Sequence, residues 1–177
     1  QLNKEGLIID DRANGGGNVS PMILERLSRE PYRLTMRRGS ARIGTVPDAV
    51  QVGPKVCLIN KYSASDGDLF PWGFRALGLG KLIGTRTWGG IVGISGSLPY
   101  MDGTDIRVPF FTSFDPKTGS WIIENHGVDP DILIDNDPVK EWNGEDQQLD
   151  RAIQEVMKEL QNRKPLPGVP TPRDFSK

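Results

Sequence analysis

One stretch of the sequence most constrains the fold: a short apolar run, a polar turn and a second apolar segment in immediate succession. The run Val56–Ile59 is bounded by a proline and an asparagine, which predicts a strand buried on both faces. The turn, residues 62–67, is small and polar. The aromatic and leucine-rich segment Leu69–Leu79 then predicts a buried helix. The chain is therefore expected to contain a strand-turn-helix unit at its centre.

The turn of this unit carries a candidate nucleophile. A serine at a strand-to-helix turn has an exposed hydroxyl, and the following N–H groups and the helix dipole favour an anion there. Ser65 has this position, whereas Ser63 lies further from the helix. Alternatively, Ser65 is only a helix N-cap, and Asp66 and Asp68 only complement the dipole. Because Pro71 deletes one helical hydrogen bond, we expect the helix to begin at Asp68 or the next residue.

A triple glycine follows the first predicted strand. The strand Gly6–Asp10 ends in a loop that contains Gly15–Gly17, and glycines leave backbone amides uncovered by side chains. The loop lacks the Walker lysine and the dinucleotide-binding spacing, so it does not indicate a phosphate site. Beside an exposed serine, it is a candidate donor of one oxyanion-hole N–H. Ser20 and Pro21 then predict a helix start, with Ser20 as the N-cap.

Strands and helices alternate in the first half of the chain, which predicts an α/β domain with a mostly parallel sheet flanked by helices. The loops after Asp10 and Asn60 should meet at the carboxyl edge of this sheet, where ligands bind in such folds. Residues 31–54 are basic and rich in turn residues, which favours an irregular surface loop with Arg33, Arg37, Arg38 and Arg42 exposed.

The second half is predicted to contain two hairpins and a final helix. The turn Asp102-Gly103 separates one pair of β-rich segments, and residues 115–119 separate the segments Phe110–Phe111 and Trp121–Ile123. Apolar residues recur at helical spacing over Leu149–Leu160. We expect one domain over residues 1–164 and an extended or disordered proline-rich tail over residues 165–177.

Composition excludes several classes of protein. The 177 residues include 22 basic and 23 acidic side chains, so the total charge indicates neither a nucleic acid nor an anionic membrane as partner. The single cysteine, Cys57, lies within an apolar strand and cannot form an internal disulfide. No apolar run is long enough to span a membrane. We predict no metal and no cofactor. Because a core strand begins almost at Gln1, we expect the chain to be part of a longer polypeptide.

The ordered motifs of the chain resemble those of a known peptidase family. The chain is similar to the C-terminal catalytic domain of tricorn-type proteases, in the wider family of C-terminal processing peptidases (family S41). The resemblance spans nearly the whole chain, through the segments GLIIDDRANGGGNVS, NKYSASDGDLF, LGLGKLIGTRTWGG and ENHGVDPDI. It implies a sheet of the ClpP and crotonase type.

The resemblance also implies the roles of individual residues. The family nucleophile falls on Ser65, the oxyanion-hole amides fall on Asp66 and Gly17, and the glutamate of the catalytic tetrad falls on Glu124. The function expected is therefore peptide hydrolysis through an acyl-enzyme on Ser65. Further candidates to line the substrate site are Gly16, Arg86 and Trp88; alternatively, Arg86 and Trp88 only pack against the fold.

The general base departs from the family pattern. Relatives with a serine–lysine dyad carry a T-F-G-K-G motif, and Gly90 occupies the position of its lysine here. Tricorn-type enzymes take a Ser-His pair from a preceding helical domain, and this chain contains no such pair. Its one histidine, His126, shares a face with Glu124 if that segment is extended, but a surface or capping role is more common. We therefore expect the base to lie outside this sequence, and the isolated chain to be nearly inactive.

The remaining expectations concern partners and alternatives. Family members form homo-oligomers, commonly hexamers, and tricorn-type enzymes are cytoplasmic, although a periplasmic location is not excluded by the sequence. Apolar or mixed cleavage preference is expected, because residues 32–38 contain no acidic side chain that would select basic substrates. Two other functions stay open: a catalytically silent binding or assembly module of the same fold, and a crotonase-like acyl-CoA enzyme.

Overall fold

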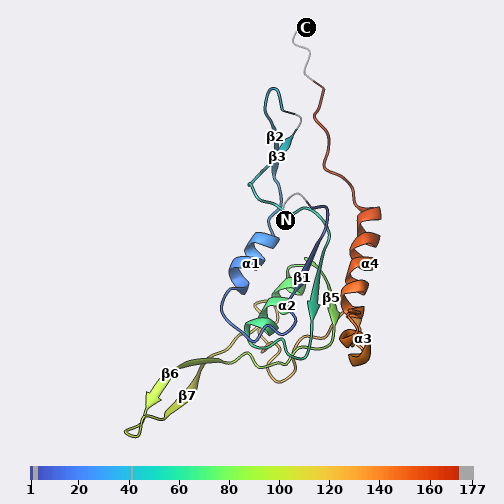
Figure 1. Cartoon of the computed structure of the whole chain (residues 1–177). Helices are drawn as coiled ribbons and strands as arrows, with labels where there is room; N and C mark the ends of the chain where they lie inside the picture. The colour runs from blue at the N-terminus through green and yellow to red at the C-terminus, as the bar shows by residue number, and fades with distance from the viewer. Residues whose placement is uncertain (2–3, 41, 172–177) are drawn as a thin grey trace.

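A four-stranded parallel sheet forms the centre of the molecule (Figure 1). The structure is a computed structural model that describes residue 1, residues 4–40 and residues 42–171. The strand order of the sheet is β1-β4-β5-β8. The strands are β1 (Leu7–Asp10), β4 (Lys55–Ile59), β5 (Gly80–Gly84) and β8 (Ile132–Leu133).

Helices cover both faces of this sheet. Helices α1 (Ser20–Leu27) and α2 (Asp66–Ala76) lie on one face, and α4 (Gln147–Asn162) lies on the other, preceded by the short α3 (Pro138–Trp142) (Figure 1). The predicted mixed α/β fold with a mostly parallel sheet is confirmed, and so is the predicted final helix.

The central strand β4 contributes to two hydrophobic clusters, one on each face. All five of its residues are buried: the predicted run Val56–Ile59 and also Lys55, which precedes it. Cys57 and Ile59 pack with Phe70 and Phe74 on the α1–α2 side, whereas Val56 and Leu58 pack with Ala152 and Val156 on the α4 side. This alternation follows from the period of two along a strand. Packing on both faces fixes the end of β4 in the interior, and it thereby fixes the start of the turn that follows.

The loops that follow β1 and β4 meet at the carboxyl edge of the sheet, as predicted. The Ala64 N–H donates to the Asn14 carbonyl at 2.8 Å, and the buried Ser63 hydroxyl donates to the Asp11 carbonyl at 2.9 Å. Ser63 is therefore a structural contact between the two loops. The glycine loop and the Ser65 turn are adjacent because these bonds join their backbones.

Two predicted helix starts are wrong. Helix α2 begins at Asp66 with Ser65 as its N-cap, and Pro71 lies inside it, rather than the helix beginning at Asp68. Helix α1 has Val19 as its N-cap, and Ser20 is its first helical residue. In both cases carboxylates of α2 stabilise the helix start. Asp66 accepts hydrogen bonds from the amides at the start of α1, and Asp68 accepts one from the amide of the α2 N-cap.

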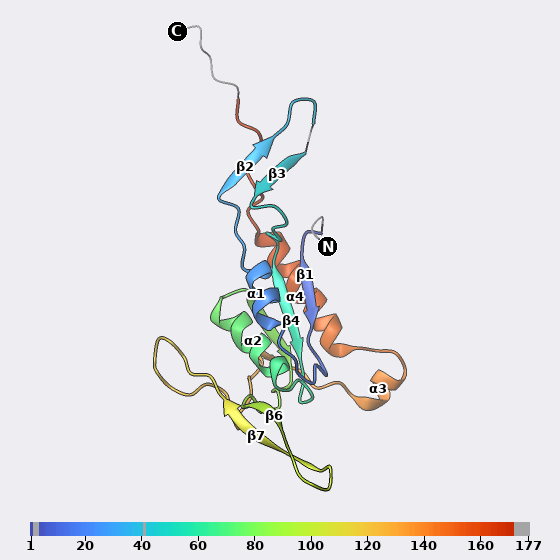
Figure 2. The same ribbon diagram turned by 90° about the vertical axis from the view of Figure 1, so that its left-hand side faces the viewer.

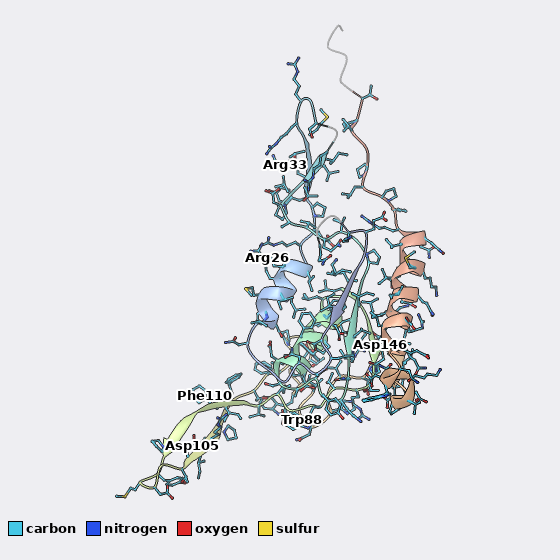
Figure 3. The ribbon with its side chains drawn as sticks, viewed as in Figure 1. Arg26, Arg33, Trp88, Asp105, Phe110 and Asp146 are labelled. Carbon is cyan, nitrogen blue, oxygen red and sulfur yellow. The ribbon has the colours of Figure 1, made fainter. Side chains whose placement is uncertain are left out.

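The basic stretch is a hairpin, which corrects the prediction of an irregular loop. Strands β2 (Arg33–Met36) and β3 (Ile43–Val46) pair antiparallel, with Arg33 opposite Val46. The β-branched residues of β3 suit a strand despite the flanking charges. Figure 3 places Arg33 at the opposite end of the molecule from Trp88. The stretch therefore does not border the edge of the sheet where the glycine loop lies.

A longer hairpin projects from the other end of the molecule (Figure 2). Its strands β6 (Gly93–Pro99) and β7 (Asp105–Phe111) flank the predicted turn at Asp102-Gly103. The second predicted hairpin is reduced to one bridge between Phe114 and Trp121, whose rings form an edge-to-face pair. After α4, residues 163–171 have no regular secondary structure. The rest of the predicted tail, residues 172–177, lies outside the described residues.

Candidate active site

Ser65 occupies a strained position between β4 and α2. Its backbone torsions are φ 56° and ψ −111°, a conformation that residues other than glycine rarely adopt. Such strain is typical of a nucleophile on a sharp strand-to-helix turn. The turn is held by the Ser65 N–H, which donates to the Asp68 carboxylate at 2.8 Å.

The glycine loop lies directly against this serine. Gly16 has a φ of 125°, and a Cβ added to it would lie 3.0 Å from Ser65 Cβ and 3.4 Å from Ser65 Oγ. On the other side of the turn, a Cβ on Gly67 would collide with the Asn14 carbonyl oxygen. Glycine at both positions therefore permits the close approach of the two backbones.

Two backbone amides beside Ser65 are not used by the fold. In the part of the chain that the structure describes, neither the Gly17 N–H nor the Asp66 N–H has a hydrogen-bond acceptor, whereas the Gly16 N–H donates to Asn14 Oδ1 at 3.1 Å. Both N–H groups therefore lack a partner among the described residues, which is what an oxyanion hole requires of its donors.

Glu124 is fixed through one of its two carboxylate oxygens. Glu124 Oε2 accepts hydrogen bonds from the Ile91 N–H at 2.7 Å and the Val92 N–H at 3.0 Å. Among the described residues, Oε1 has no hydrogen-bond partner. The side chain is half-buried, so this second oxygen can accept a hydrogen bond from another group.

His126 and Arg86 share an exposed carboxylate. His126 Nε2 lies 2.8 Å from Asp129 Oδ2, and Arg86 Nε lies 3.2 Å from Asp129 Oδ1. All three side chains are more than half exposed. Their described contacts therefore connect them to each other and not to Ser65, which favours the surface role of His126 over a catalytic one.

Trp88 lies on a segment bonded to the turn that carries Ser65. Its backbone N–H donates to the Ser63 carbonyl at 2.9 Å. The residue is 66% exposed, and its ring covers Gly90 so closely that a Cβ on Gly90 would overlap it. Figure 3 shows Trp88 at the carboxyl end of the sheet. An exposed aromatic face is thus present near Ser65, at the position where dyad-type relatives carry a lysine.

The chain matches a described enzyme family. Residues 1–134 match the profile of Peptidase family S41. The chain belongs to peptidase family S41.

Members with similar sequences are tricorn proteases. The chain is 42% identical over 167 residues to a tricorn protease of Thermoplasma volcanium, covering 93% of this chain and 16% of that protein. It is 43% identical over 159 residues to a tricorn protease of Thermoplasma acidophilum, covering 89% of this chain and 15% of that protein. A crystal structure of tricorn protease superposes with a TM-score of 0.82 at 41% identity, covering 91% of this chain and 16% of that one. The chain thus spans only 15–16% of the length of these relatives.

Two acidic residues of this S41 chain became notable only in the structure. Asp68 is fully buried and accepts three backbone N–H groups, although its position in the sequence indicates only a charge at a helix start. Asp11, 7% exposed, lies below the glycine loop. Its Oδ1 accepts from Asn14 Nδ2 at 2.9 Å, and its Oδ2 is buried without a hydrogen-bond partner. The one sequence signal for Asp11 is its position directly after the first strand.

The environment of Asp11 favours its neutral form. Burial raises the pKa of Asp11 to about 7, and the charges of Asp66, Asp10 and Asp68 raise it further, against the lowering effect of the Asn14 hydrogen bond. A proton on Asp11 therefore reduces the negative charge below the glycine loop near neutral pH.

Neither a metal centre nor a membrane span is found in the described part of the chain. Among the described residues, no group of three or more His, Cys, Asp or Glu side chains could hold a metal ion. No helix there has the length and apolar character needed to cross a membrane.

Proposed function

We propose that this S41 chain is the catalytic domain of a serine peptidase and that it forms an acyl-enzyme on Ser65. The strained backbone of Ser65, packed against Gly16, is the observation that carries this proposal. A serine held in this way keeps its hydroxyl at the edge of the sheet, beside two amides that have no acceptor among the residues the structure describes.

In the proposed reaction, Ser65 Oγ attacks the carbonyl carbon of a peptide bond while a general base accepts its proton. The Gly17 and Asp66 N–H groups donate to the oxyanion of the tetrahedral intermediate. When the intermediate collapses, the C–N bond breaks and the protonated base returns its proton to the leaving amine. Water then attacks the acyl carbonyl while the same base takes one of its protons. The bond from the acyl carbon to Ser65 Oγ breaks, the base returns the proton to Oγ, and the carboxylic acid product leaves.

Glu124 is proposed to orient the group that carries the base. Its Oε2 binds two amides, which fixes the carboxylate, and its Oε1 can accept a hydrogen bond. A carboxylate in this role holds its partner in the reactive orientation and stabilises the positive charge that develops on the base.

The base itself is proposed to come from a Ser-His pair of a preceding helical domain. Two observations support this assignment. His126 is bonded to Asp129 on the surface, and the lysine position of dyad-type relatives is a glycine covered by an indole ring. The isolated chain should therefore hydrolyse peptides very slowly.

Peptides are the proposed substrates. Gly16 and Trp88 adjoin Ser65 through the loops described above, and Arg86 is included as a third substrate contact. The exposed face of the Trp88 ring favours apolar side chains. As in the oligomers expected of the family, a homo-oligomer is the proposed working state, and a hexamer is its proposed form.

Supplying imidazole as an external base tests this proposal. The chain is incubated with a fluorophosphonate, and the rate of Ser65 modification is measured by mass spectrometry with increasing concentrations of imidazole as an external base. We expect slow labelling that increases with imidazole and is lost in Ser65→Ala. Ser28→Ala, which removes an exposed hydroxyl at the end of α1, is the matched control and should label normally.

Two results would contradict the proposal. Labelling that survives in Ser65→Ala would assign the chemistry to another residue. A chain that is never labelled, with or without imidazole, would be a silent binding module.

A further inference from the structure

The Asp68 carboxylate is the most densely bonded acidic group beside Ser65. It is fully buried, and its Oδ2 accepts from the Ser65 N–H at 2.8 Å and from the Gly90 N–H at 3.2 Å, while Oδ1 accepts from the Gly89 N–H at 2.7 Å. Backbone amides and the N-terminus of α2 therefore stabilise its negative charge. This one side chain joins the nucleophile turn to a segment more than twenty residues later.

Glu124 binds the next two amides of the same segment. The N–H groups of Gly89 and Gly90 donate to Asp68, and those of Ile91 and Val92 donate to Glu124. Four consecutive amides are thus divided between two carboxylates. The segment 89–92, hereafter the bridging segment, links Asp68 to Glu124.

Both ends of this link are anchored further. The Trp88 N–H donates to the Ser63 carbonyl at 2.9 Å, and the Asn125 N–H donates to the Gly89 carbonyl at 2.7 Å. The backbones on either side of the bridging segment are therefore tied to the nucleophile turn and to the chain around Glu124. A displacement of the bridging segment would move both Ser65 and Glu124.

The strained torsions of Ser65 require such a restraint. A φ of 56° is unfavourable for serine, and rotation to an ordinary φ would turn the Ser65 N–H away from Asp68. The same rotation would reorient the peptide that carries the Asp66 N–H, because that peptide begins at Ser65. The hydrogen bond from Ser65 to Asp68 therefore opposes relaxation of the turn.

We propose that Asp68 is a positioning residue for the reaction on Ser65. It holds the nucleophile and the adjacent Asp66 amide in their reactive geometry, and through the bridging segment it fixes their placement relative to Glu124. Asp68 does not contact the substrate. This role rests on the proposed function of Ser65, but the backbone restraint can be measured independently of any chemistry.

Amide hydrogen exchange measured by NMR tests the restraint. Asp68→Asn keeps the size of the side chain but leaves one acceptor oxygen and loses the charge. We expect the Ser65, Gly89 and Gly90 amides to exchange at least tenfold faster in the variant, whereas amides of α4 are unchanged. Asp137→Asn is the matched control, since Asp137 also accepts from two amides, at the start of α3, and it should leave these three rates unchanged.

Fluorophosphonate labelling in the presence of imidazole tests the consequence for Ser65. We expect Asp68→Asn to lower the labelling rate at least tenfold while its circular dichroism spectrum remains that of the wild type. Equal labelling rates in the two folded proteins would overturn the positioning role. If the wild type itself is not labelled, the proposed function fails, and the exchange rates still decide whether Asp68 restrains the turn.

The wild-type chain provides a measurement that does not depend on folding of the variant. Its Ser65, Gly89 and Gly90 amides should be protected from exchange at least tenfold relative to the Thr104 amide at the hairpin tip, whose acceptor, Asp102, is exposed. Protection no greater than at Thr104 would overturn the proposal.

Discussion

The turn at Ser65 and the hairpin β6–β7 are built in opposite ways. Around Ser65, buried carboxylates accept backbone amides from several segments, and glycines allow those segments to touch. In the hairpin, every residue of β7 is exposed, and large apolar side chains such as Phe110 face solvent. The comparison shows that buried polar contacts gather at one edge of the sheet, whereas the hairpin is held by the pairing of β6 with β7, and β7 presents exposed side chains.

Truncation of an aromatic ring in each region should give the largest difference. Phe74 is fully buried in the cluster on the α1–α2 face, and Phe110 is 76% exposed. We expect Phe74→Ala to lower the free energy of unfolding by about 4 kcal/mol, because it leaves a cavity, and Phe110→Ala to change it by less than about 0.5 kcal/mol. Urea denaturation measures both values. A large loss from Phe110→Ala would show that the hairpin packs on the body of the chain.

Alanine at one glycine of each region is the next largest contrast. A Cβ on Gly67 would collide with the Asn14 carbonyl, whereas a Cβ on Gly103 meets nothing within 4 Å but requires a residue at φ 82°. We expect Gly67→Ala to lower the free energy of unfolding by about 3 kcal/mol, because the backbone must be displaced. Gly103→Ala should lower it by about 1 kcal/mol, because alanine is strained at this φ. Equal losses in thermal unfolding would contradict the close contact between the two loops.

The pH dependence of stability should distinguish Asp11 from Asp102 at the hairpin tip. Burial raises the pKa of Asp11 to about 7, so the folded chain binds a proton that the unfolded chain, at a pKa of 3.8, has released. Stability from this group is present at low pH and is lost as the pH rises from about 4 through 7. We expect Asp11→Asn to flatten this slope and to be the more stable protein at pH 8, by about 1–3 kcal/mol, because Oδ2 of the buried carboxylate has no hydrogen-bond partner.

Asp102→Asn is the control for this experiment. A hydrogen bond from Thr104 lowers the pKa of Asp102, so any stability it adds is lost only as the pH falls below about 4. Between pH 5 and pH 8 the variant should follow the wild-type curve. A wild-type curve that is already flat over this range would remove the argument for a proton on Asp11.

Glycine in place of Ser65 should give the smallest effect, and in the stabilising direction. Glycine adopts a φ of 56° without steric cost, so Ser65→Gly should raise the free energy of unfolding by about 1 kcal/mol while labelling at this position is lost. Ser113→Gly, in the irregular segment after the hairpin, should not be stabilising. Destabilisation by Ser65→Gly would indicate that the serine side chain, rather than its backbone, supports the turn.

Much of the carboxyl edge of the sheet could be predicted from the sequence, because the sequence patterns that indicate it are local. The buried run ending at Ile59 and the glycines at 15–17 mark two strand ends, and parallel strands bring such ends together. The position of Ser65 at the head of a helix followed from the same pattern. The resemblance to a peptidase family, confirmed by the match over residues 1–134, added the role of that position.

The long-range partners of polar side chains could not be predicted in the same way. Asp68 binds amides at Gly89 and Gly90, and nothing near Asp68 in the sequence indicates them. The start of α2 was misplaced for the same reason, since these bonds support a turn that Pro71 alone would weaken. The hairpin β2–β3 was missed because its charges masked short β-branched segments.

The indole of Trp88 over Gly90 separates this chain from its serine–lysine relatives by more than one substitution. An ammonium group placed at position 90 would need the volume that the indole now fills, and it would also have to lose water to act as a base. A serine–lysine dyad in this chain would therefore need a smaller side chain at position 88 together with the new lysine. Under the proposed function, a base from another domain could therefore not be replaced by one lysine substitution, because the shape of this segment leaves no room for it.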